Sequence, residues 1–545
     1  MKSFNSKLAA CILAVAMIVL ILPVFAGASA APAGYNAHDY FKLLPFMETV
    51  NEDGVKNGDI INADGYDPEN PSTWYSYVLD ETEAEIFQGI VWYEVDGEYR
   101  VTDIVIHGLG LGGTLDVSGC DELLYVSCGY NRLDAFITNG AEKLADVYCV
   151  NSGLDSLDFS ENPELSELFC FENRLTELDV SSNAKLKTLL CGYNKLTELD
   201  VSSNPALTYL SCYDNELTEL DISANTELVN LACDGNSLTE LDLSRNSKLL
   251  WLFCSNNRIS ELDLSSNPDL MGIDCSGNDL STLDVSACTG LQELACGDNG
   301  LVRLSLANNP SLSKLNIDNN FVEHIDLSNL PALYEFSCNN NSLTELILDN
   351  CSSLSSLSFD NNMISEIDLS VCPFIEFISC KNNVLRSLDL SGCCYMTPMT
   401  LTAEGSGFIS MRLGWNMQIM DYDTLAFAEP ESGAEFVCWV DASGNEVSTY
   451  AEFNFGEYLN DEASSVAFTA RFAAAPSETP TETPTELPTE TPTEIPTEAP
   501  SAAPSETPNP AVPSTGAGTA AAAGFALILI GIAGFCIKKR TSCLD

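Results

Sequence analysis

The sequence predicts a mainly β solenoid, in which coils of 21 residues stack on one another between an N-terminal cap and a small β module. The strongest observation is an asparagine that recurs every 21 residues without a break. The positions are Asn173, Asn194, Asn215, Asn236, Asn257, Asn278, Asn299, Asn320, Asn341, Asn362 and Asn383, with Asn131 and Ser152 in the same register. Apolar and polar residues alternate in the phrases Leu-x-Cys and Leu-x-Ile, which is the period of a short strand. The length of 545 residues also exceeds one compact domain and suits a repeat array.

The composition excludes several classes of function. Lys and Arg number 23 against 79 Asp and Glu, so the formal net charge is −56, and such a chain repels the phosphate backbone of a nucleic acid. Hydrophobic residues make up 45% of the chain, which is enough for a core and excludes wholesale disorder. The histidines, His38, His107 and His324, stand far apart, which argues against a histidine-based metal or acid–base site.

Residues 1–30 have the pattern of a signal peptide. Lys2 and Lys7 precede an apolar run over residues 8–24, and the small residues of 26–30 suit signal peptidase. The mature chain is therefore expected to begin near Ala31 and to be exported.

Residues 31–107 do not follow the period, and we expect them to form an N-terminal cap. The open end of a solenoid exposes core and strand edges, which a cap covers. The apolar spacing of residues 39–47 predicts a short helix interrupted at Pro45, and the patterns of residues 88–92 and 99–106 predict strands.

Residues 108–400 contain the repeats. The unit from Leu207 to Asn225 carries the leucine-rich-repeat phrase LxxLxLxxN twice, so each half is expected to supply a short strand. Asn215 and Asn225 then stand where their amides hydrogen-bond the backbone of the turns, which would otherwise be unsatisfied inside the stack.

Most of the cysteines occupy two columns of the repeat. Three residues before the register position stand Cys128, Cys149, Cys170, Cys191, Cys212, Cys233, Cys254, Cys275, Cys296, Cys338 and Cys380. Ile317 and Phe359 complete this column and mark it as apolar. The second column holds asparagine in other coils, and its cysteines are Cys120, Cys288, Cys351, Cys372 and Cys393.

The geometry of a coil stack favours buried thiols over disulfides in these columns. Residues in register lie about 4.8 Å apart and point the same way, whereas a relaxed disulfide needs roughly 3.8 Å between Cβ atoms. The thiols then serve as small hydrophobic side chains. Secretion favours the disulfide alternative, and zinc is weaker than either because the array has no CxxC pair.

The repeat and its cysteine column resemble a known family over residues 100–395. The phrase LxxLxCxxNxLTxLDLSxNxx is similar to that of the internalin-J-like, cysteine-ladder leucine-rich-repeat surface proteins of Gram-positive bacteria. Residues 89–92, 100–104 and 110–116 likewise look like the N-terminal cap of many leucine-rich-repeat proteins. The resemblance implies a wall-attached adhesin, whereas the repeats alone imply a binding scaffold.

Residues 401–475 lose the period and alternate like strands, which predicts a small β module. The phrase from Ala434 to Gly444, followed by residues 468–472, resembles the internalin-B-type B-repeat, a β-rich stalk module. The alternative is a C-terminal cap and spacer without further function.

The end of the chain predicts a spacer and an anchor. Residues 476–511 are rich in Pro, Thr and Glu, and are expected to extend away from the envelope. In residues 512–545 a VPSTG motif precedes 21 mostly apolar residues and a basic tail, which suits a transmembrane span. This order resembles the sortase signal of Gram-positive surface proteins, and implies cleavage between Thr515 and Gly516 and attachment to the cell wall. The family usually has Leu where this chain has Val512, and an uncut single-pass anchor is the alternative.

Aromatic residues on the strands of the first half-repeats are the candidate binding residues. They are Tyr148, Phe169, Phe171, Tyr209, Tyr213, Trp251 and Phe253. Exposed aromatics gathered on one strand face are typical of a site for sugar rings or a protein partner. The alternative is that neighbouring rings stack along the ladder and stabilise the sheet.

The second half-repeats present stacked carboxylates, as in Glu219-Leu-Asp221. A glycosidase needs two carboxylates in unlike environments, and no GxSxG, SxxK, phosphate loop or HExxH is present, so we do not expect an enzyme. A solvated face is favoured, with bound Ca²⁺ as a weak alternative and no other cofactor. The loop of residues 51–70 is also expected to be solvated, because its Asp53-to-Gly58 phrase lacks an oxygen ligand at the third position.

These features together indicate a surface-anchored leucine-rich-repeat adhesin. Its expected partners are an extracellular host or community protein or glycan, together with sortase, the cell wall and the membrane. A structural cell-surface component without a specific ligand is the alternative.

Overall fold

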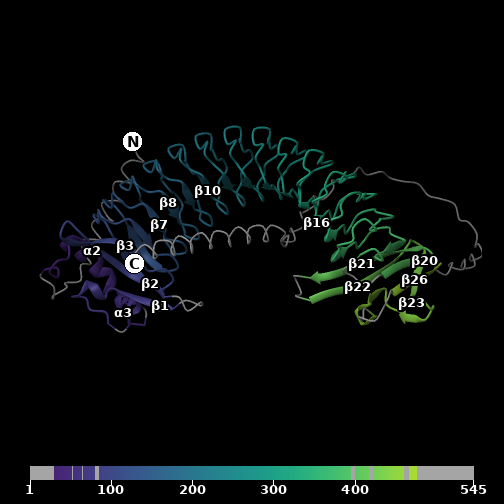
Figure 1. Cartoon of the computed structure of the whole chain (residues 1–545), viewed down its shortest axis with the longest axis horizontal. Helices are drawn as coiled ribbons and strands as arrows, with labels where there is room; N and C mark the ends of the chain where they lie inside the picture. Colours follow the sequence, from purple (N-terminus) through teal and green to yellow (C-terminus); the bar gives the residue numbers. More distant parts are fainter. Residues whose placement is uncertain are drawn as a thin grey trace, which may run out of the picture. The chain divides into compact units, whose positions relative to one another are not determined.

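The computed structural model describes residues 30–474 except for 52, 64, 80–84, 394–398, 417–420 and 459–465. The chain divides into two compact units, unit one up to Leu249 and unit two from Leu250 (Figure 1). Both are built from coils of 21 residues with one short strand in each, and helix is confined to a few turns. The predicted mainly β solenoid is confirmed.

The N-terminal segment opens with helix α2 (Ala37–Met47). The side-chain oxygen of Asn36 caps it by accepting hydrogen bonds from the backbone N–H groups of His38 and Asp39. The expected interruption at Pro45 is wrong, because the helix continues through this residue. Proline removes one N–H donor close to the helix end, and the buried apolar side chains of α2 hold the last turn in place.

Short helical turns and an antiparallel sheet follow α2. The turns are α3 (Asn57–Ile61) and η1 (Pro71–Thr73), and the strands are β1 (Tyr75–Leu79), β2 (Glu85–Val95) and β3 (Glu98–Val105). The strands expected at residues 88–92 and 99–106 are therefore present. Strand β3 also pairs in parallel with the first coil strand, β5, which joins this sheet to the coils of unit one. Buried Asp39 fixes the helix to the sheet, because the Arg100 Nε donates to its Oδ2 at 2.8 Å.

The coils of unit one stack their strands into a parallel sheet (Figure 1). The strands are β5 (Tyr125–Ser127), β7 (Asp146–Tyr148), β8 (Glu167–Phe169), β9 (Thr188–Leu190), β10 (Tyr209–Ser211) and β11 (Asn230–Ala232). Each pairs with the strand 21 residues away, as Tyr209 does with Thr188. The middle residue, such as Leu210, is buried in the core. Strands β4 (Gly112–Asp116) and β6 (Arg132–Ile137) form a separate parallel pair.

The second half of most coils forms no strand among the described residues, so the expectation of a strand in each half is wrong. A turn takes its place. The Asp221 Oδ1 accepts the backbone N–H of Ser223 at 2.9 Å, which bends the chain where a strand would extend. A single backbone bond, from the N–H of Glu216 to the carbonyl of Leu196 at 2.9 Å, links this half to the preceding coil.

Two asparagine ladders satisfy the backbone inside the stack, as expected. The Asn215 Nδ2 donates to the carbonyls of Cys191 and Cys212 at 3.1 and 3.0 Å, and its Oδ1 accepts the N–H of Leu196 at 3.0 Å. The Asn225 Nδ2 donates to carbonyls of the preceding coil at 2.9 Å. These amides replace the water that the buried carbonyls lose.

The cysteines of the described residues are all buried free thiols. Burial raises the pKa of Cys191 and of Cys296 to about 12. In the second column the thiol takes over the donor role of asparagine. The Cys288 Sγ donates to the carbonyl of Asn267 at 3.5 Å, one coil away, just as the Asn225 Nδ2 donates one coil away.

Unit two continues the same coil. Its parallel strands are β12 (Trp251–Phe253), β13 (Gly272–Asp274), β14 (Glu293–Ala295), β15 (Lys314–Asn316), β16 (Glu335–Ser337), β17 (Ser356–Ser358) and β18 (Phe377–Ser379). Beyond residue 270 the outward residues are mostly small or polar, so the aromatic character of the strands in unit one is not repeated here.

A set of strands that pair mostly, but not entirely, in antiparallel fashion follows the coils of unit two. They are β19 (Ser387–Asp389), β20 (Met399–Glu404), β21 (Gly407–Asn416), β22 (Asp421–Pro430), β23 (Ala434–Asp441), β24 (Glu446–Ser448), β25 (Glu452–Asn454) and β26 (Val466–Ala474), with the turn η2 (Gly456–Tyr458). Strand β21 pairs antiparallel with β18, so a hairpin covers the free edge of the last coil. The core of this part contains Trp439, Phe455 and Phe468.

Candidate binding site

The outward side chains of the coil strands in unit one form the candidate site. We call "strand face" the first and third residue of β5 and β7–β11, together with the two residues that precede the register position of each coil. In a strand the first and third residues share one side, opposite the buried middle residue. The residue directly before the register position has a left-handed backbone in every coil of unit one, with φ near 50° in Tyr193, for example. This conformation turns the chain away from the strand.

The predicted residues Tyr148 and Phe169 are neighbours on the strand face. Their ring centroids lie 4.4 Å apart with an interplanar angle of 68°, and Tyr125 adds a third ring at 5.5 Å from Tyr148. Tyr148 is 5% and Phe169 4% exposed, and the Tyr148 hydroxyl donates to the Glu167 Oε2 at 2.5 Å. The stacking alternative therefore describes this end of the strand face, where rings pack along the sheet. Phe171, two residues after Phe169, is half-buried.

The predicted residues Tyr209 and Tyr213 are half-buried. The Tyr213 ring packs edge-to-face against Tyr193, with centroids 4.9 Å apart and an interplanar angle of 78°. Tyr193 is the more accessible of the two, with 51% of its surface exposed. Burial raises the pKa of Tyr213, and the charges of neighbouring acidic residues raise it further. The part of this pair that is open to solvent therefore belongs mainly to Tyr193.

The predicted residues Trp251 and Phe253 lie on β12 in unit two. Their rings are nearly parallel, at an angle of 3°, with centroids 6.3 Å apart. The indole covers the next coil, because a Cβ atom at Gly272 would lie 2.1 Å from the Trp251 Cζ3. These residues form a stacked pair of their own.

Sequence reasoning missed Tyr125, Tyr130 and Tyr193. Tyr125 is the first residue of β5, as Tyr209 is of β10, so the alternation of strand residues could have identified it. Tyr130 and Tyr193 stand in the left-handed position, outside the alternation of a strand, and are 47% and 51% exposed. Tyr130 packs against His107 at 5.0 Å, and burial lowers the pKa of that histidine.

The strand face of unit one is acidic as well as aromatic. Glu172 and Asp214 occupy the left-handed position in two coils. The Glu172 Oε2 accepts a hydrogen bond from the Asn151 Nδ2 at 3.0 Å, and Asp214 bonds to the side chain of Tyr193. Burial raises the pKa of Asp214, and the bond to Tyr193 lowers it in part. A carboxylate that is partly withdrawn from water beside two phenol rings is suited to an electrostatic contact with a cation.

The stacked aspartates of the second half-repeats have a structural role instead. Asp179, Asp200 and Asp221 each accept the backbone N–H two residues later at 2.9 Å, and the hydrogen bonds from that serine lower their pKa. Each member of the column has the same environment, so the column supplies no pair of unlike carboxylates for acid–base chemistry. Among the described residues, no group of three or more His, Cys, Asp or Glu side chains is arranged to hold a metal ion.

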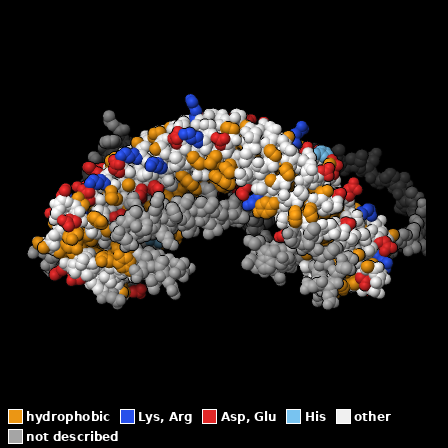
Figure 2. All heavy atoms as spheres, viewed as in Figure 1, with side chains coloured by type: hydrophobic (Ala, Val, Ile, Leu, Met, Phe, Trp, Pro, Cys, Tyr) orange, Lys and Arg blue, Asp and Glu red, His pale blue; other side chains and the backbone are white. Residues whose placement is uncertain are grey.

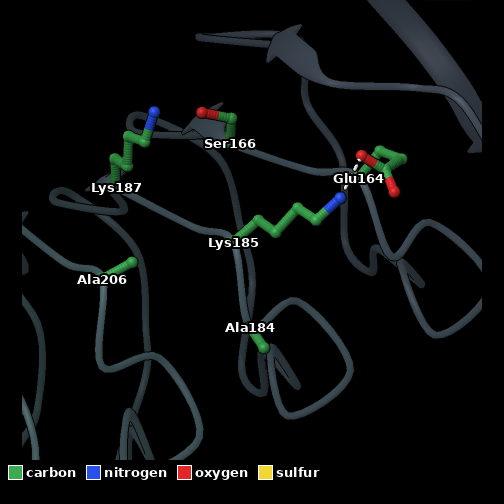
Figure 3. A pocket seen from close by; sticks show the side chains of 6 residues that line it. All are labelled: Glu164, Ser166, Ala184, Lys185, Lys187 and Ala206. Carbon is green, nitrogen blue, oxygen red and sulfur yellow. Dashed lines mark hydrogen bonds and ion pairs between the residues drawn. The ribbon is translucent and has the colours of Figure 1, made fainter.

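An open hollow on the surface of unit one lies at the turns that lead into β8 and β9 (Figure 3). It is lined by Glu164, Ser166, Ala184, Lys185, Lys187 and Ala206. Lys185 forms an ion pair with Glu164 in the preceding coil, so the charges of the hollow are partly matched within the protein. On the face shown in Figure 2, basic and acidic side chains are interspersed over the described surface.

The predicted cleavage site at Thr515 and Gly516 and the predicted transmembrane span lie outside the described residues, as do the expected spacer and residues 1–29 of the expected signal peptide. Within the described ranges, no helix is long and apolar enough to cross a membrane.

Neither a known protein family nor a curated protein sequence matches the chain. Solved structures do match it. The functional domain of InlJ from Listeria monocytogenes, which includes a cysteine ladder, aligns with a TM-score of 0.53 and 26% identity, over 68% of this chain and 90% of that one. The internalin InlF from the same species has a TM-score of 0.47 and 21% identity over 52% of this chain and 89% of its own. A leucine-rich-repeat protein of Leptospira interrogans has a TM-score of 0.45 and 21% identity over 49% and 78%.

The likeness to InlJ confirms the predicted resemblance to cysteine-ladder leucine-rich-repeat proteins. The InlJ domain includes a cysteine ladder, and this chain carries a column of buried cysteines in its coils. Solenoids of this kind offer an extended row of outward strand residues as a binding surface, so the architecture is that of a protein-binding repeat protein.

Proposed function

We propose that this chain is a secreted, surface-anchored binding protein that recognises an extracellular protein or glycan through the strand face of unit one. The observation that carries the proposal is the choice of tyrosine at two left-handed backbone positions, Tyr130 and Tyr193, where the side chains are exposed.

The left-handed position has a clear residue preference elsewhere in the chain. In unit two it holds Asn256, Gly277, Asp298, Asn319, Asn340, Asn361 and Asn382. Asn, Asp and Gly tolerate this conformation, whereas a bulky side chain costs about 1–2 kcal/mol there. Tyrosine at 130 and 193 is therefore not explained by the backbone, and a role for the exposed ring accounts for it.

The rings on the strand face are also held in defined positions. Tyr213 packs edge-to-face on Tyr193, and Tyr193 keeps 51% of its surface exposed. Tyrosine side chains with few free torsions bind partners at a low cost in conformational entropy. A preorganised aromatic surface of this kind suits either a protein or a sugar ring.

The location on the cell surface rests on the two ends of the sequence. The apolar run of residues 8–24 and the motif–span–basic order of residues 512–545 support export and anchoring. In this proposal Thr515 is joined to the cell wall after cleavage before Gly516, and the spacer of residues 476–511 holds the coils away from the envelope.

Binding of the full chain to arrays of extracellular proteins and glycans tests the recognition part. The informative variant is Tyr193→Ala with Tyr213→Ala, and the matched control is Tyr450→Ala, which removes a tyrosine that is 78% exposed in unit two. We expect a ligand that wild type and control bind alike and that the double variant loses. Absence of any ligand, or equal binding by all three chains, would favour a structural cell-surface component instead.

Fractionation of a Gram-positive host tests the anchoring part. The wild type is expected in the fraction released by cell-wall digestion, with Thr515 as its last residue by mass spectrometry, whereas Thr515→Ala should stay with the membrane. Recovery of wild-type chain with Asp545 still at its C-terminus would show that the span is retained uncut.

A further inference from the structure

The charged residues on the strand face of unit one are all acidic, and they lie among the aromatic residues. The columns of the strand face contain Asp146, Glu167, Glu172, Asp214 and Asp234 but no lysine or arginine, and all of these columns lie in the described part of the chain. Basic residues of the same coils stand in other columns. Lys143, Lys185 and Lys248, for example, form ion pairs with glutamates one coil away.

The carboxylates and the rings meet at Tyr193 and Tyr213. Glu172, Tyr193 and Asp214 occupy the left-handed position of three successive coils. The backbone N–H of Glu172 donates to the carbonyl of Gly192 at 3.0 Å, and the N–H of Tyr193 donates to the carbonyl of Tyr213 at 2.9 Å, so the acids and the phenols stand on neighbouring coils. In keeping with this placement, burial raises the pKa of Tyr193, and the negative charges of Asp214 and Glu172 raise it further. The same two charges act on Tyr213. The edge-to-face pair of tyrosines therefore lies in a negative local field.

Asp214 is held in place by its surroundings. It bonds to Tyr193, and its Oδ1 lies so close to the next coil that a Cβ atom at Gly235 would approach it within 2.2 Å. The nearest basic side chains along the sequence, Arg174 and Lys195, come after the register asparagines and so lie outside the columns of the strand face. A carboxylate fixed beside aromatic rings provides the two elements that bind an ammonium or guanidinium group, an opposite charge and a π face.

We propose that Tyr193, Tyr213, Glu172 and Asp214 bind a lysine or arginine side chain of a basic segment of an extracellular protein. This inference rests on the proposed function of the strand face and specifies its partner. Charge complementarity selects this occupant, because a second copy of this chain or an acidic glycan would bring further negative charge to the cluster.

Direct binding of the full chain to three probes tests the inference. The first is a short peptide that carries lysine and arginine, the second is the same peptide with acetyl-lysine and citrulline in their place, and the third is a neutral glycan array. We expect the wild type to bind the basic peptide and not its neutral counterpart, and the affinity to fall as ionic strength rises.

The variant that tests the residues is Glu172→Gln with Asp214→Asn. It keeps the shape and one acceptor oxygen on each side chain while removing two charges, and should weaken binding of the basic peptide about tenfold. The matched control is Glu198→Gln with Glu219→Gln, which removes the same charge from exposed residues in the second half-repeats. Circular dichroism spectra of the variants and wild type verify that each chain folds.

Each outcome decides between the two claims. If the control weakens binding as much as the test variant, the attraction is general and the cation site is wrong. If the wild type binds a neutral glycan or the neutral peptide through Tyr193 and Tyr213, and the charge variant has no effect, the cation inference fails while the proposed function stands. If the wild type binds none of the probes or arrayed ligands, both fail.

Discussion

The ring of Tyr213 lies over the backbone of Gly192 in the preceding coil, where a Cβ atom at residue 192 would approach the Tyr213 Cε1 within 2.4 Å. Because Gly192 has no side chain, the Tyr213 ring can occupy the space above its Cα; we call this space the notch. Tyr193, the next residue, packs against the same ring. The aromatic pair therefore depends on the absence of a side chain at position 192.

Gly192→Ala is expected to weaken ligand binding without removing any functional group. The added methyl must displace the Tyr213 ring, and since that ring is the movable partner, the free energy of unfolding should fall by no more than about 1 kcal/mol. Gly290→Ala is the control, because nothing lies within 4 Å of a Cβ atom at that position. Titration of both variants with the ligand of the strand face provides the measurement, and unchanged affinity in Gly192→Ala would contradict the role of the notch.

Tyr193→Asn is expected to separate stability from binding. Asparagine suits the left-handed backbone better than tyrosine, and this gain offsets the lost ring contact, so the free energy of unfolding should stay within about 1 kcal/mol of wild type. Binding to the strand face should be lost. The reverse change in unit two, Asn361→Tyr, should destabilise the chain by about 1–2 kcal/mol in denaturant unfolding, because it adds backbone strain and breaks the bond from its Nδ2 to the Asn340 Oδ1. A large loss of stability in Tyr193→Asn would show that the tyrosine is structural.

The sequence predicted the coil more completely than the site. Asparagine and cysteine recur every 21 residues because every coil repeats the same buried contacts, so one unit such as Leu207 to Asn225 reveals all of them. Tyr148 and Phe169 were found because strand columns follow a period of two. The orientation of Tyr193 depends on its left-handed φ, and a tyrosine in the sequence gives no sign of that backbone conformation. The prediction of a strand in the second half of each coil was wrong because Asp221 forms a turn with Ser223.

The thiols of the coil ladder are expected to resist alkylation in the folded chain. The pKa of Cys149, Cys191 and Cys296 is raised to about 12 by burial, so the reactive thiolate is scarce at pH 8 and the sulfur is shielded from reagent. Iodoacetamide labelling followed by peptide mass spectrometry should mark these cysteines only after unfolding. Rapid labelling of ladder cysteines in the native chain would show that the coils open locally.

Asp318→Asn is expected to stabilise the chain at neutral pH. Burial raises the pKa of Asp318 despite the hydrogen bonds it accepts from Ser337 and Asn339. The folded state thus binds the proton more tightly than the unfolded state, and the contribution of Asp318 to stability is greatest at low pH and is lost as pH rises through the folded-state pKa. Asparagine can keep both bonds, as the Asn339 Oδ1 does with Ser358 and Asp360 at 2.7 and 2.6 Å.

The measurement for Asp318 is denaturant unfolding of wild type and variant between pH 4 and pH 7. The variant should gain on the order of 1 kcal/mol relative to wild type as pH rises. Asp326→Asn is the control with the opposite sign, because the hydrogen bonds from Ser328 lower the pKa of Asp326, so wild type should lose its advantage over this variant as pH falls. If the stability of both variants relative to wild type changed with pH in the same direction, the opposite pKa shifts of Asp318 and Asp326 would be contradicted.

The last prediction concerns the exchange of cysteine and asparagine in the second column. Cys288 donates one weak bond, at 3.5 Å, to the coil before it, whereas Asn225 donates two bonds at 2.9 Å. Cys288→Asn gains a donor but also buries a side-chain oxygen, and the two effects oppose each other, so we expect a change within about 1 kcal/mol in the free energy of unfolding. Cys288→Ala loses the donor and leaves a gap, and should cost about 1–2 kcal/mol. Asn225→Cys is the reverse exchange and should also be tolerated. If the asparagine variant were as unstable as the alanine variant, the thiol would be required for its size and polarity together, and the equivalence of the two side chains in this column would be wrong.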